Sequence, residues 1–305
     1  MTNTSPTPCA FGALQYHPGS TSLVLVNTGN YPAYLQTNIN SWTWNGTNWT
    51  LLNSTVVNNP SSRTGMGMAY DGTNLVLFGG QGPDGTGYMN DSWTWNGMVW
   101  ANPIANDGYN NGLTIRTRPY MATMSGGVVL FGGKDYNHTL NDTWMWTSGS
   151  WTLQSPIASP SIRLDAAFAS NGTNKAVIFG GANGSYALND TWLWNNTNWS
   201  QLTTNTSPCV RKGAVMAWYP TGSYFLLFGG SDSNGNLLND TWAFDPTSNI
   251  WTNLKPAVSP SVRIGAMMAY DVSSSQIILF GGKDSKNLLN DTWTYNSGSN
   301  VWIKL

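Results

Sequence analysis

The chain has 305 residues, a formal net charge of −1 and only 9% charged residues. A nearly neutral chain has no excess of basic side chains for binding nucleic acid or an anionic membrane surface, so no nucleic acid is expected as a partner. The length would permit two domains, and the charged fraction is well below the roughly one quarter that is usual in soluble domains.

The first unit along the chain, residues 9–52, is the least regular. Residues 9–16 and 22–26 have the β-branched and aromatic composition of short strands. A long loop that includes residues 31–36 separates them from Asn40-Ser41-Trp42. Terminal units of repeat proteins are commonly atypical, and the alternative is that this long loop binds a ligand.

Five more regular units follow, at residues 60–104, 114–155, 161–202, 208–254 and 260–305. The last is the clearest, with strand-like runs at 263–271, 276–282, 289–295 and 301–305 between Gly, Asn, Ser and Asp turns. None of these runs has helical periodicity. Four consecutive strands with short turns form an antiparallel meander, which cannot bury both of its faces without neighbours.

Three landmarks recur in register through the chain, with a spacing of about fifty residues. Phe-Gly-Gly begins at Phe78, Phe131, Phe179, Phe228 and Phe280. Asn-Asp-(Thr/Ser)-Trp begins at Asn90, Asn141, Asn189, Asn239 and Asn290. A closing tryptophan follows at Trp49, Trp100, Trp151, Trp199, Trp251 and Trp302. In combination with an arginine before the first strand, this pattern resembles the kelch repeat.

The resemblance to a kelch-repeat β-propeller covers residues 9–305 and implies an all-β fold. We expect a single six-bladed β-propeller over residues 1–305, with four antiparallel strands per blade, the first innermost. The double glycines are expected to adopt positive φ, and the Asp of each Asn-Asp motif is expected to cap a turn. Because each chain end completes a blade, ring closure is expected to rest on packing of the first blade against the sixth.

An arginine precedes the first strand of every regular unit, at Arg63, Arg116, Arg163, Arg211 and Arg263. In kelch adaptor proteins the matching arginines line the mouth of the central channel and hold acidic peptides. The resemblance therefore implies a ligand site at these five positions. The alternative is structural: each arginine pairs with an Asp of a neighbouring blade or with carbonyl groups.

Two residues after the arginine position most units have glycine, at Gly65, Gly213, Gly265 and, in the first unit, Gly12. The units at residues 114–155 and 161–202 have Arg118 and Asp165 instead. Positions two apart on a strand share a face. We therefore expect Arg118 and Asp165 to point where the arginines point, and to form an ion pair or to contact a ligand.

The irregular loops are expected on the rim where the arginines begin their strands, together with aromatic and basic side chains. This chemistry suits acidic or sugar ligands. We predict a site for a protein or carbohydrate ligand over the channel mouth. Its candidate residues are Arg63, Arg116, Arg118, Arg163, Asp165, Arg211, Arg263, Lys134, Tyr136, His138 and Tyr186.

Catalysis is not expected. Galactose oxidase, an enzyme with this fold, uses a copper centre with two His, two Tyr and a Cys. The two histidines of this chain, His17 and His138, are expected on opposite rims and cannot share a metal. The chain has no Glu to serve as a general acid. We therefore expect no cofactor and no metal.

The composition favours an extracellular or cell-surface protein, with its signal sequence outside this chain; a cytoplasmic protein is the alternative. No apolar run approaches membrane-spanning length, so no membrane insertion is expected. About fifteen Asn-x-(Ser/Thr) triplets occur. The possible glycosylation sites are Asn45, Asn48, Asn137, Asn171, Asn195 and Asn198. Cys9 and Cys209 are expected two blades apart, so both thiols should be free and buried.

The leading hypothesis is a non-catalytic propeller that binds a protein segment or a glycan. The second is a structural subunit of an extracellular assembly, in which the Asn/Thr-rich surface packs against other chains. The third is an enzyme similar to galactose oxidase, which the missing copper ligands disfavour.

Overall fold

The computed structural model describes residues 5–27, 39–52, 59–82, 87–104 and 111–305. Helical structure in these ranges is limited to two 3₁₀ turns, Pro18–Ser20 and Pro220–Gly222. The described chain is otherwise β-strands and their connections. No helix in this part of the chain has the length and apolar character that crossing a membrane requires.

Six four-stranded antiparallel sheets follow one another along the chain. The first two blades are β1 (Ala13–His17), β2 (Ser22–Asn27), β3 (Asn40–Trp44), β4 (Trp49–Leu51), and β5 (Gly67–Tyr70), β6 (Leu75–Gln81), β7 (Tyr88–Trp95), β8 (Trp100–Ile104). The third blade is β9 (Tyr120–Met124), β10 (Gly127–Lys134), β11 (Thr139–Thr147) and β12 (Ser150–Gln154).

The fourth blade is β13 (Ala167–Ser170), β14 (Ala176–Phe179), β17 (Thr191–Trp194) and β18 (Trp199–Leu202), with a small hairpin of β15 (Ala182–Asn183) and β16 (Tyr186–Ala187). The last two are β19 (Val215–Tyr219), β20 (Tyr224–Ser231), β21 (Leu237–Asp245), β22 (Ile250–Asn253), and β23 (Met267–Asp271), β24 (Gln276–Phe280), β25 (Thr292–Asn296), β26 (Val301–Lys304).

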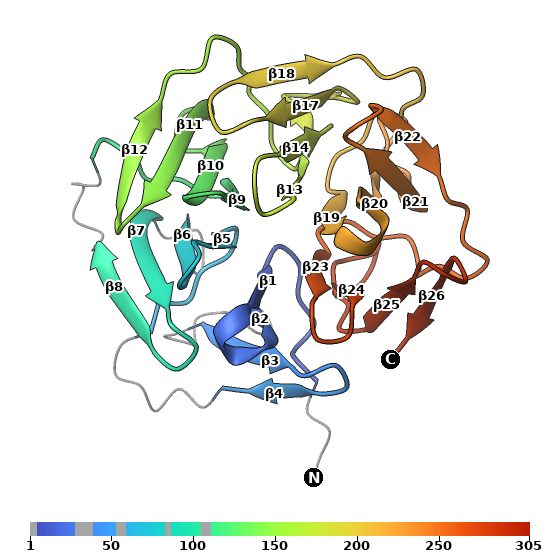
Figure 1. Ribbon diagram of the computed structural model, residues 1–305, viewed down its shortest axis with the longest axis horizontal. Helices are drawn as coiled ribbons and strands as arrows, with labels where there is room; N and C mark the ends of the chain where they lie inside the picture. The colour runs from blue at the N-terminus through green and yellow to red at the C-terminus, as the bar shows by residue number, and fades with distance from the viewer. Residues whose placement is uncertain (1–4, 28–38, 53–58, 83–86, 105–110) are drawn as a thin grey trace.

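The six sheets stand around a central axis with their first strands innermost and their fourth strands outermost (Figure 1). The blue β1 and the red β23 lie side by side, so the first and sixth blades are neighbours. This confirms the predicted all-β, six-bladed propeller.

Apolar packing between blades forms the core. Each of six buried clusters combines residues of two neighbouring blades. The phenylalanine of Phe-Gly-Gly contacts the closing tryptophan of the next blade edge to face or at a tilt, for example Phe131 with Trp199 at 5.1 Å between ring centroids and Phe179 with Trp251 at 4.8 Å. Such aromatic pairs contribute roughly 0.5–1.5 kcal/mol beyond the area they bury.

A hydrogen bond accompanies each of these contacts. The indole N–H of every closing tryptophan donates to the hydroxyl that follows Asn-Asp, or its counterpart, in the preceding blade. The pairs are Trp100–Ser41, Trp151–Ser92, Trp199–Thr143, Trp251–Thr191, Trp302–Thr241 and Trp49–Thr292, at 2.9–3.3 Å. The repeated Thr or Ser is therefore a link between blades.

Ring closure uses the same contacts as every other blade boundary. Trp49 donates to Thr292 across the boundary between the first and sixth blades. The backbone N–H of Cys9 donates to Leu289 O at 3.0 Å, and Cys9 O accepts from Gly282 N at 2.8 Å. Face packing, as predicted, thus acts together with specific hydrogen bonds between the blades.

The double glycines have the positive φ that was predicted. Gly281 and Gly282, for example, have φ of 64° and 93°. A Cβ on Gly281 would lie 2.7 Å from Cys9 O, and one on Gly282 would lie 2.9 Å from Ile264 O. With glycine here, the end of the second strand can pass close to the next blade's backbone at the first position and to its own blade's backbone at the second.

Candidate functional site

The five repeated arginines are buried inside their blades, with side-chain exposures of 0–1%. Each forms a two-pronged ion pair with the Asp of the Asn-Asp motif in its own blade. The pairs are Arg63–Asp91, Arg116–Asp142, Arg163–Asp190, Arg211–Asp240 and Arg263–Asp291. The guanidinium also donates to the carbonyl of the first glycine in Phe-Gly-Gly, as Arg163 does to Gly180 O at 3.0 Å.

Three expectations are corrected by this arrangement. These five arginines do not line the channel mouth, because a carboxylate of the same blade holds each of them inside that blade. The alternative that each arginine pairs with an Asp of a neighbouring blade was also wrong. The motif Asp is not a turn cap. Its second oxygen accepts the indole N–H two residues later at 2.7 Å, as in Trp192 to Asp190, so the motif is an Arg–Asp–Trp network within one blade.

Blade one lacks this network and replaces both of its charged members. Cys9 occupies the arginine position, as its backbone hydrogen bonds to Leu289 and Gly282 show. Asn40 stands two residues before Trp42, where the regular blades have Asp. The Cys9 thiol accepts a hydrogen bond from Asn27 Nδ2 at 3.4 Å, and burial raises its pKa to about 11. Losing both charges together avoids an unpaired buried ion.

Six residues form a backbone ring at the mouth of the channel where the first strands begin. Five N–H to O=C hydrogen bonds of 2.6–3.3 Å link neighbouring blades: Phe11 to Gly265, Gly65 to Phe11, Arg118 to Gly65, Gly213 to Asp165, and Gly265 to Gly213. All six residues have positive φ, which is 55° for Arg118 and between 58° and 71° for the other five. The left-handed conformation is thus common to the ring.

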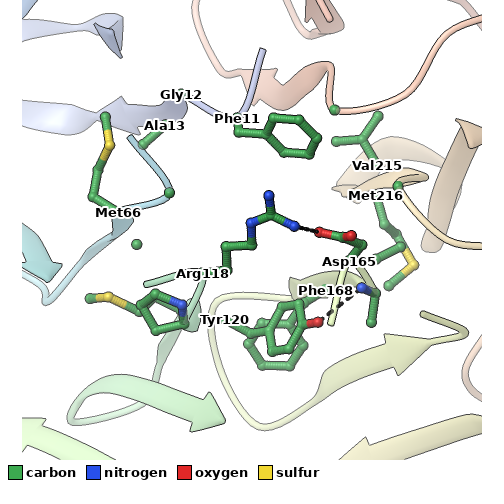
Figure 2. A pocket seen from close by; sticks show the side chains of 18 of the residues that line it. Phe11, Gly12, Ala13, Met66, Arg118, Tyr120, Asp165, Phe168, Val215 and Met216 are labelled. Carbon is green, nitrogen blue, oxygen red and sulfur yellow. Dashed lines mark hydrogen bonds and ion pairs between the residues drawn. The ribbon is translucent and has the colours of Figure 1, made fainter. Parts of the chain in front are cut away.

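Three of these left-handed positions carry side chains, and all three project into one cavity. Figure 2 shows the Arg118 guanidinium between the Phe11 ring and the Asp165 carboxylate. Arg118 Nη1 donates to Asp165 Oδ1 at 2.7 Å, and its Cζ lies 5.0 Å from the Phe11 ring centroid. Lys283 Nζ lies 5.8 Å from the same centroid. The cavity has a volume of about 220 Å³, and we call this end of the channel the arginine mouth.

The ion pair between Arg118 and Asp165 was one of the two predicted outcomes. The side chains do not share a direction with the buried arginines, however. Both residues precede their strands and have left-handed backbone, so the two-residue alternation of an extended strand does not apply. In blade one the equivalent residue is Phe11, one position before the predicted Gly12, and sequence reasoning missed it.

Tyr120 joins the third and fourth blades beneath the ion pair. Its hydroxyl accepts from Ala166 N at 2.9 Å and donates to Arg163 O at 3.4 Å. Burial raises the pKa of Tyr120. This link replaces the sixth ring bond, since among the described residues no backbone hydrogen bond joins Arg118 to Asp165.

The other predicted site residues lie on the same rim but outside the cavity. Lys134 ends β10 and pairs with Thr117 through their backbones. Tyr136 stacks on Tyr88 with ring centroids 4.6 Å apart, and its hydroxyl accepts from Tyr88 N at 2.8 Å. His138 and Tyr186 are also outside the lining, with His138 Nδ1 3.6 Å from Asp135 Oδ1. The first blade's loop, residues 28–38, lies outside the described residues.

The two histidines lie on opposite rims of the propeller. His17 ends β1 at the opposite end of the strands from His138, which precedes β11. Burial lowers the pKa of His17, which packs on Trp95 at 4.9 Å between ring centroids. Cys209 is exposed, contrary to prediction. It stands where the other regular blades have a Ser or Thr whose hydroxyl accepts a hydrogen bond from the arginine two residues later, and its thiol accepts one from Arg211. Within the described residues, no three His, Cys, Asp or Glu side chains form a group that could hold a metal.

Three of the six candidate glycosylation asparagines stabilise turns. Asn45, Asn171 and Asn195 accept two or more backbone N–H groups through their side-chain oxygens at 2.8–3.1 Å. Asn198 accepts from Ile157 N at 3.0 Å. Asn48 and Asn137 are exposed. Modification of any of them stays a prediction.

Comparison with known proteins agrees with this architecture. No curated protein matches the sequence. A family model described as the KLHDC2/KLHL20/DRC7 Kelch-repeats domain matches residues 114–257 and 194–305. These two matches together span the third to sixth blades, more than half of the chain. The chain belongs to the kelch-repeat family of β-propellers.

Proposed function

We propose that this propeller is a non-catalytic binding module that takes a short protein segment with an acidic side chain at the arginine mouth. Kelch propellers are typically protein-interaction modules. The observation that carries the proposal is the occupation of three left-handed ring positions by Phe11, Arg118 and Asp165. Glycine at the other three positions avoids a strain of roughly 1–2 kcal/mol per residue. Backbone strain that packing does not require clusters at binding sites.

The chemistry of the three side chains supports this ligand class. The Arg118 side chain is 42% exposed and uses only part of its N–H donors on Asp165. A guanidinium presents parallel donors that fit a carboxylate. Asp165, which is 22% exposed, can accept an N–H from the ligand backbone. The face of Phe11 offers an apolar contact beside both charges.

The test is a selection of peptides from a random library on the immobilised protein, followed by affinity measurements. Each selected peptide is compared with a partner in which Asp or Glu is replaced by Asn or Gln. We expect the acidic member to bind about 10- to 100-fold more tightly, as one charge-assisted hydrogen bond contributes roughly 1.5–3 kcal/mol. Arg118→Gly should remove this preference, whereas Lys286→Ala on an exposed loop of the same rim should keep it. Binding without acidic preference, or unchanged binding by Arg118→Gly, contradicts the proposal.

We also propose an extracellular or cell-surface location. The support is compositional: 9% charged residues, no Glu, and many Asn-x-(Ser/Thr) triplets. Secretion of the full-length gene product with N-linked glycan, detected as a mass shift that an amidase removes, is the expected result. A product that stays in the cytoplasm contradicts this location.

A structural subunit is the second candidate, and the outer strands and their connections supply its specific observation. Met98 is 82% exposed and Ile157 is 94% exposed. In that role, these side chains would contact further chains of the assembly. Light scattering on the purified protein distinguishes the two: a concentration-dependent assembly favours the structural subunit, and a monomer favours the binding module.

A further inference from the structure

A second cavity opens at the opposite end of the channel, where the first strands end. Its volume is about 290 Å³. Five apolar side chains line both this cavity and the one at the arginine mouth: Leu14, Met68, Met121, Phe168 and Met216. The two cavities are therefore the two ends of one channel with an apolar waist.

Aromatic side chains from four consecutive blades line one side of this second cavity. They stand five residues after the ring residue of their blade: Trp218, Tyr270, Tyr16 and Tyr70 from the fifth, sixth, first and second blades. All four are partly exposed. The same position carries Thr123 and Ser170 in the remaining blades, and both line the cavity. We call this end the aromatic mouth.

The aromatic residues are held in place by the protein. Trp218 packs on Phe225 at 4.8 Å between ring centroids. Tyr270 packs edge to face on Tyr219 at 5.9 Å, and the Tyr70 hydroxyl donates to Gly72 O at 2.7 Å. A surface fixed before binding loses little conformational entropy when a ligand arrives.

The lining of the aromatic mouth has no charged residue among the described residues. The absence of a cation argues against an acidic ligand, and no carboxylate of the lining adds to the attraction of the aromatic faces for a cationic one. Residues with polar but neutral side-chain groups are present, namely Gln15, Asn171, Trp218 and hydroxyl-bearing residues including Tyr270. The cavity thus combines flat apolar faces with uncharged hydrogen-bonding groups.

We propose that the aromatic mouth binds a neutral saccharide, independently of the peptide at the arginine mouth. A pyranose ring presents apolar C–H faces that stack on aromatic rings, and a rim of hydroxyls that exchange hydrogen bonds with amides, hydroxyls and an indole N–H. The four-blade aromatic side contacts the sugar faces. Thr123 and Ser170 on the other side contact its hydroxyls with the hydrogen-bonding capacity that their bonds to Tyr70 N and Thr123 O leave free.

The experiment uses neutral trisaccharides of glucose, galactose, mannose and N-acetylglucosamine with the full chain. Saturation-transfer NMR detects binding, and calorimetry gives the affinity. We expect at least one trisaccharide to bind at millimolar concentration or better. Trp218→Ala and Tyr16→Ala should each weaken it by about tenfold, the scale of one aromatic stacking contact.

The controls separate this site from the arginine mouth and from effects on folding. Tyr186→Ala, an aromatic 80% exposed on the other rim, and Arg118→Gly should leave saccharide binding unchanged. Tyr270→Phe keeps the ring and removes only its hydroxyl, so it should fold normally and weaken binding by a few-fold. The proposal is overturned if no trisaccharide binds, if the aromatic variants bind as wild type, or if a proline-rich peptide occupies this mouth and no saccharide displaces it.

Discussion

Breaking the buried Arg163–Asp190 pair should destabilise the protein strongly, and the contacts set the scale. The side chain of Arg163 has an exposure of 0%. It donates to Ser161 O, Ser161 Oγ and Gly180 O at 3.0–3.1 Å, and to both Asp190 oxygens at 2.7 and 2.8 Å. Arg163→Ala removes all five bonds and leaves the carboxylate with Trp192 as its side-chain donor.

Removing one partner of a buried ion pair costs about 3–5 kcal/mol, on the order of 10 °C in Tm for a chain of this size. Blade one shows how both partners are replaced, with Cys9 and Asn40. We therefore expect Arg163→Cys/Asp190→Asn to cost less than the sum of the two single changes, by about 1–3 kcal/mol.

Urea unfolding of the wild type, the two single variants and the double variant measures this coupling directly. Near-additive costs would show that the guanidinium and the carboxylate stabilise the blade independently. That result would refute the inference that the arginine and the aspartate act as one unit. Blade one is the reason for this inference, because it replaces both residues together.

Three further results are expected. Burial raises the pKa of Asp190, but the hydrogen bonds and charge of Arg163, together with the Trp192 indole and a backbone N–H, hold it below its ordinary 3.8. The contribution of this carboxylate to stability is therefore complete above about pH 4 and is lost as the pH falls through the folded pKa. Acid unfolding of Asp190→Asn should depend less on pH than that of the wild type. Trp49→Phe removes the bond to Thr292 that closes the ring and should lower the free energy of unfolding by about 1–3 kcal/mol; an unchanged urea midpoint contradicts that role. A thiol reagent should modify Cys209, which is exposed, in the native protein, and the buried Cys9 only after unfolding; two thiols reacting at one fast rate would show that Cys9 is accessible.

Much of the fold could be predicted because the structural motifs repeat. Phe-Gly-Gly and Asn-Asp-(Thr/Ser)-Trp have the same structural role in each of the five regular blades, and the closing tryptophan has the same role in all six. Their spacing therefore reveals the number of blades. Repetition also indicates a structural role, and the five buried arginines show this. The sequence left open which carboxylate each arginine would meet, since the Arg–Asp pairs join residues 26–29 positions apart.

The candidate site could be predicted only where the repeat is broken. Arg118 and Asp165 stood out because glycine occupies their position in other blades. Phe11 did not, since blade one lacks the arginine that fixes the alignment and Gly12 stands one residue later. The aromatic mouth was also missed. Its four aromatic residues become neighbours only when the ring closes and brings the fifth and sixth blades beside the first and second.

The most direct test of the functional role of the arginine mouth is the stability of Arg118→Gly/Asp165→Gly measured beside its peptide affinity. Relief of strain contributes about 1–2 kcal/mol per residue. The greater freedom of glycine in the unfolded chain costs about 0.5–1 kcal/mol per residue, and loss of a partly exposed ion pair costs up to about 1 kcal/mol. The net change therefore lies between a loss of about 1 and a gain of about 3 kcal/mol. We expect an unfolding free energy within that range together with loss of acidic-peptide binding; a loss of stability as large as that of Arg163→Ala would show instead that these side chains hold the blades together.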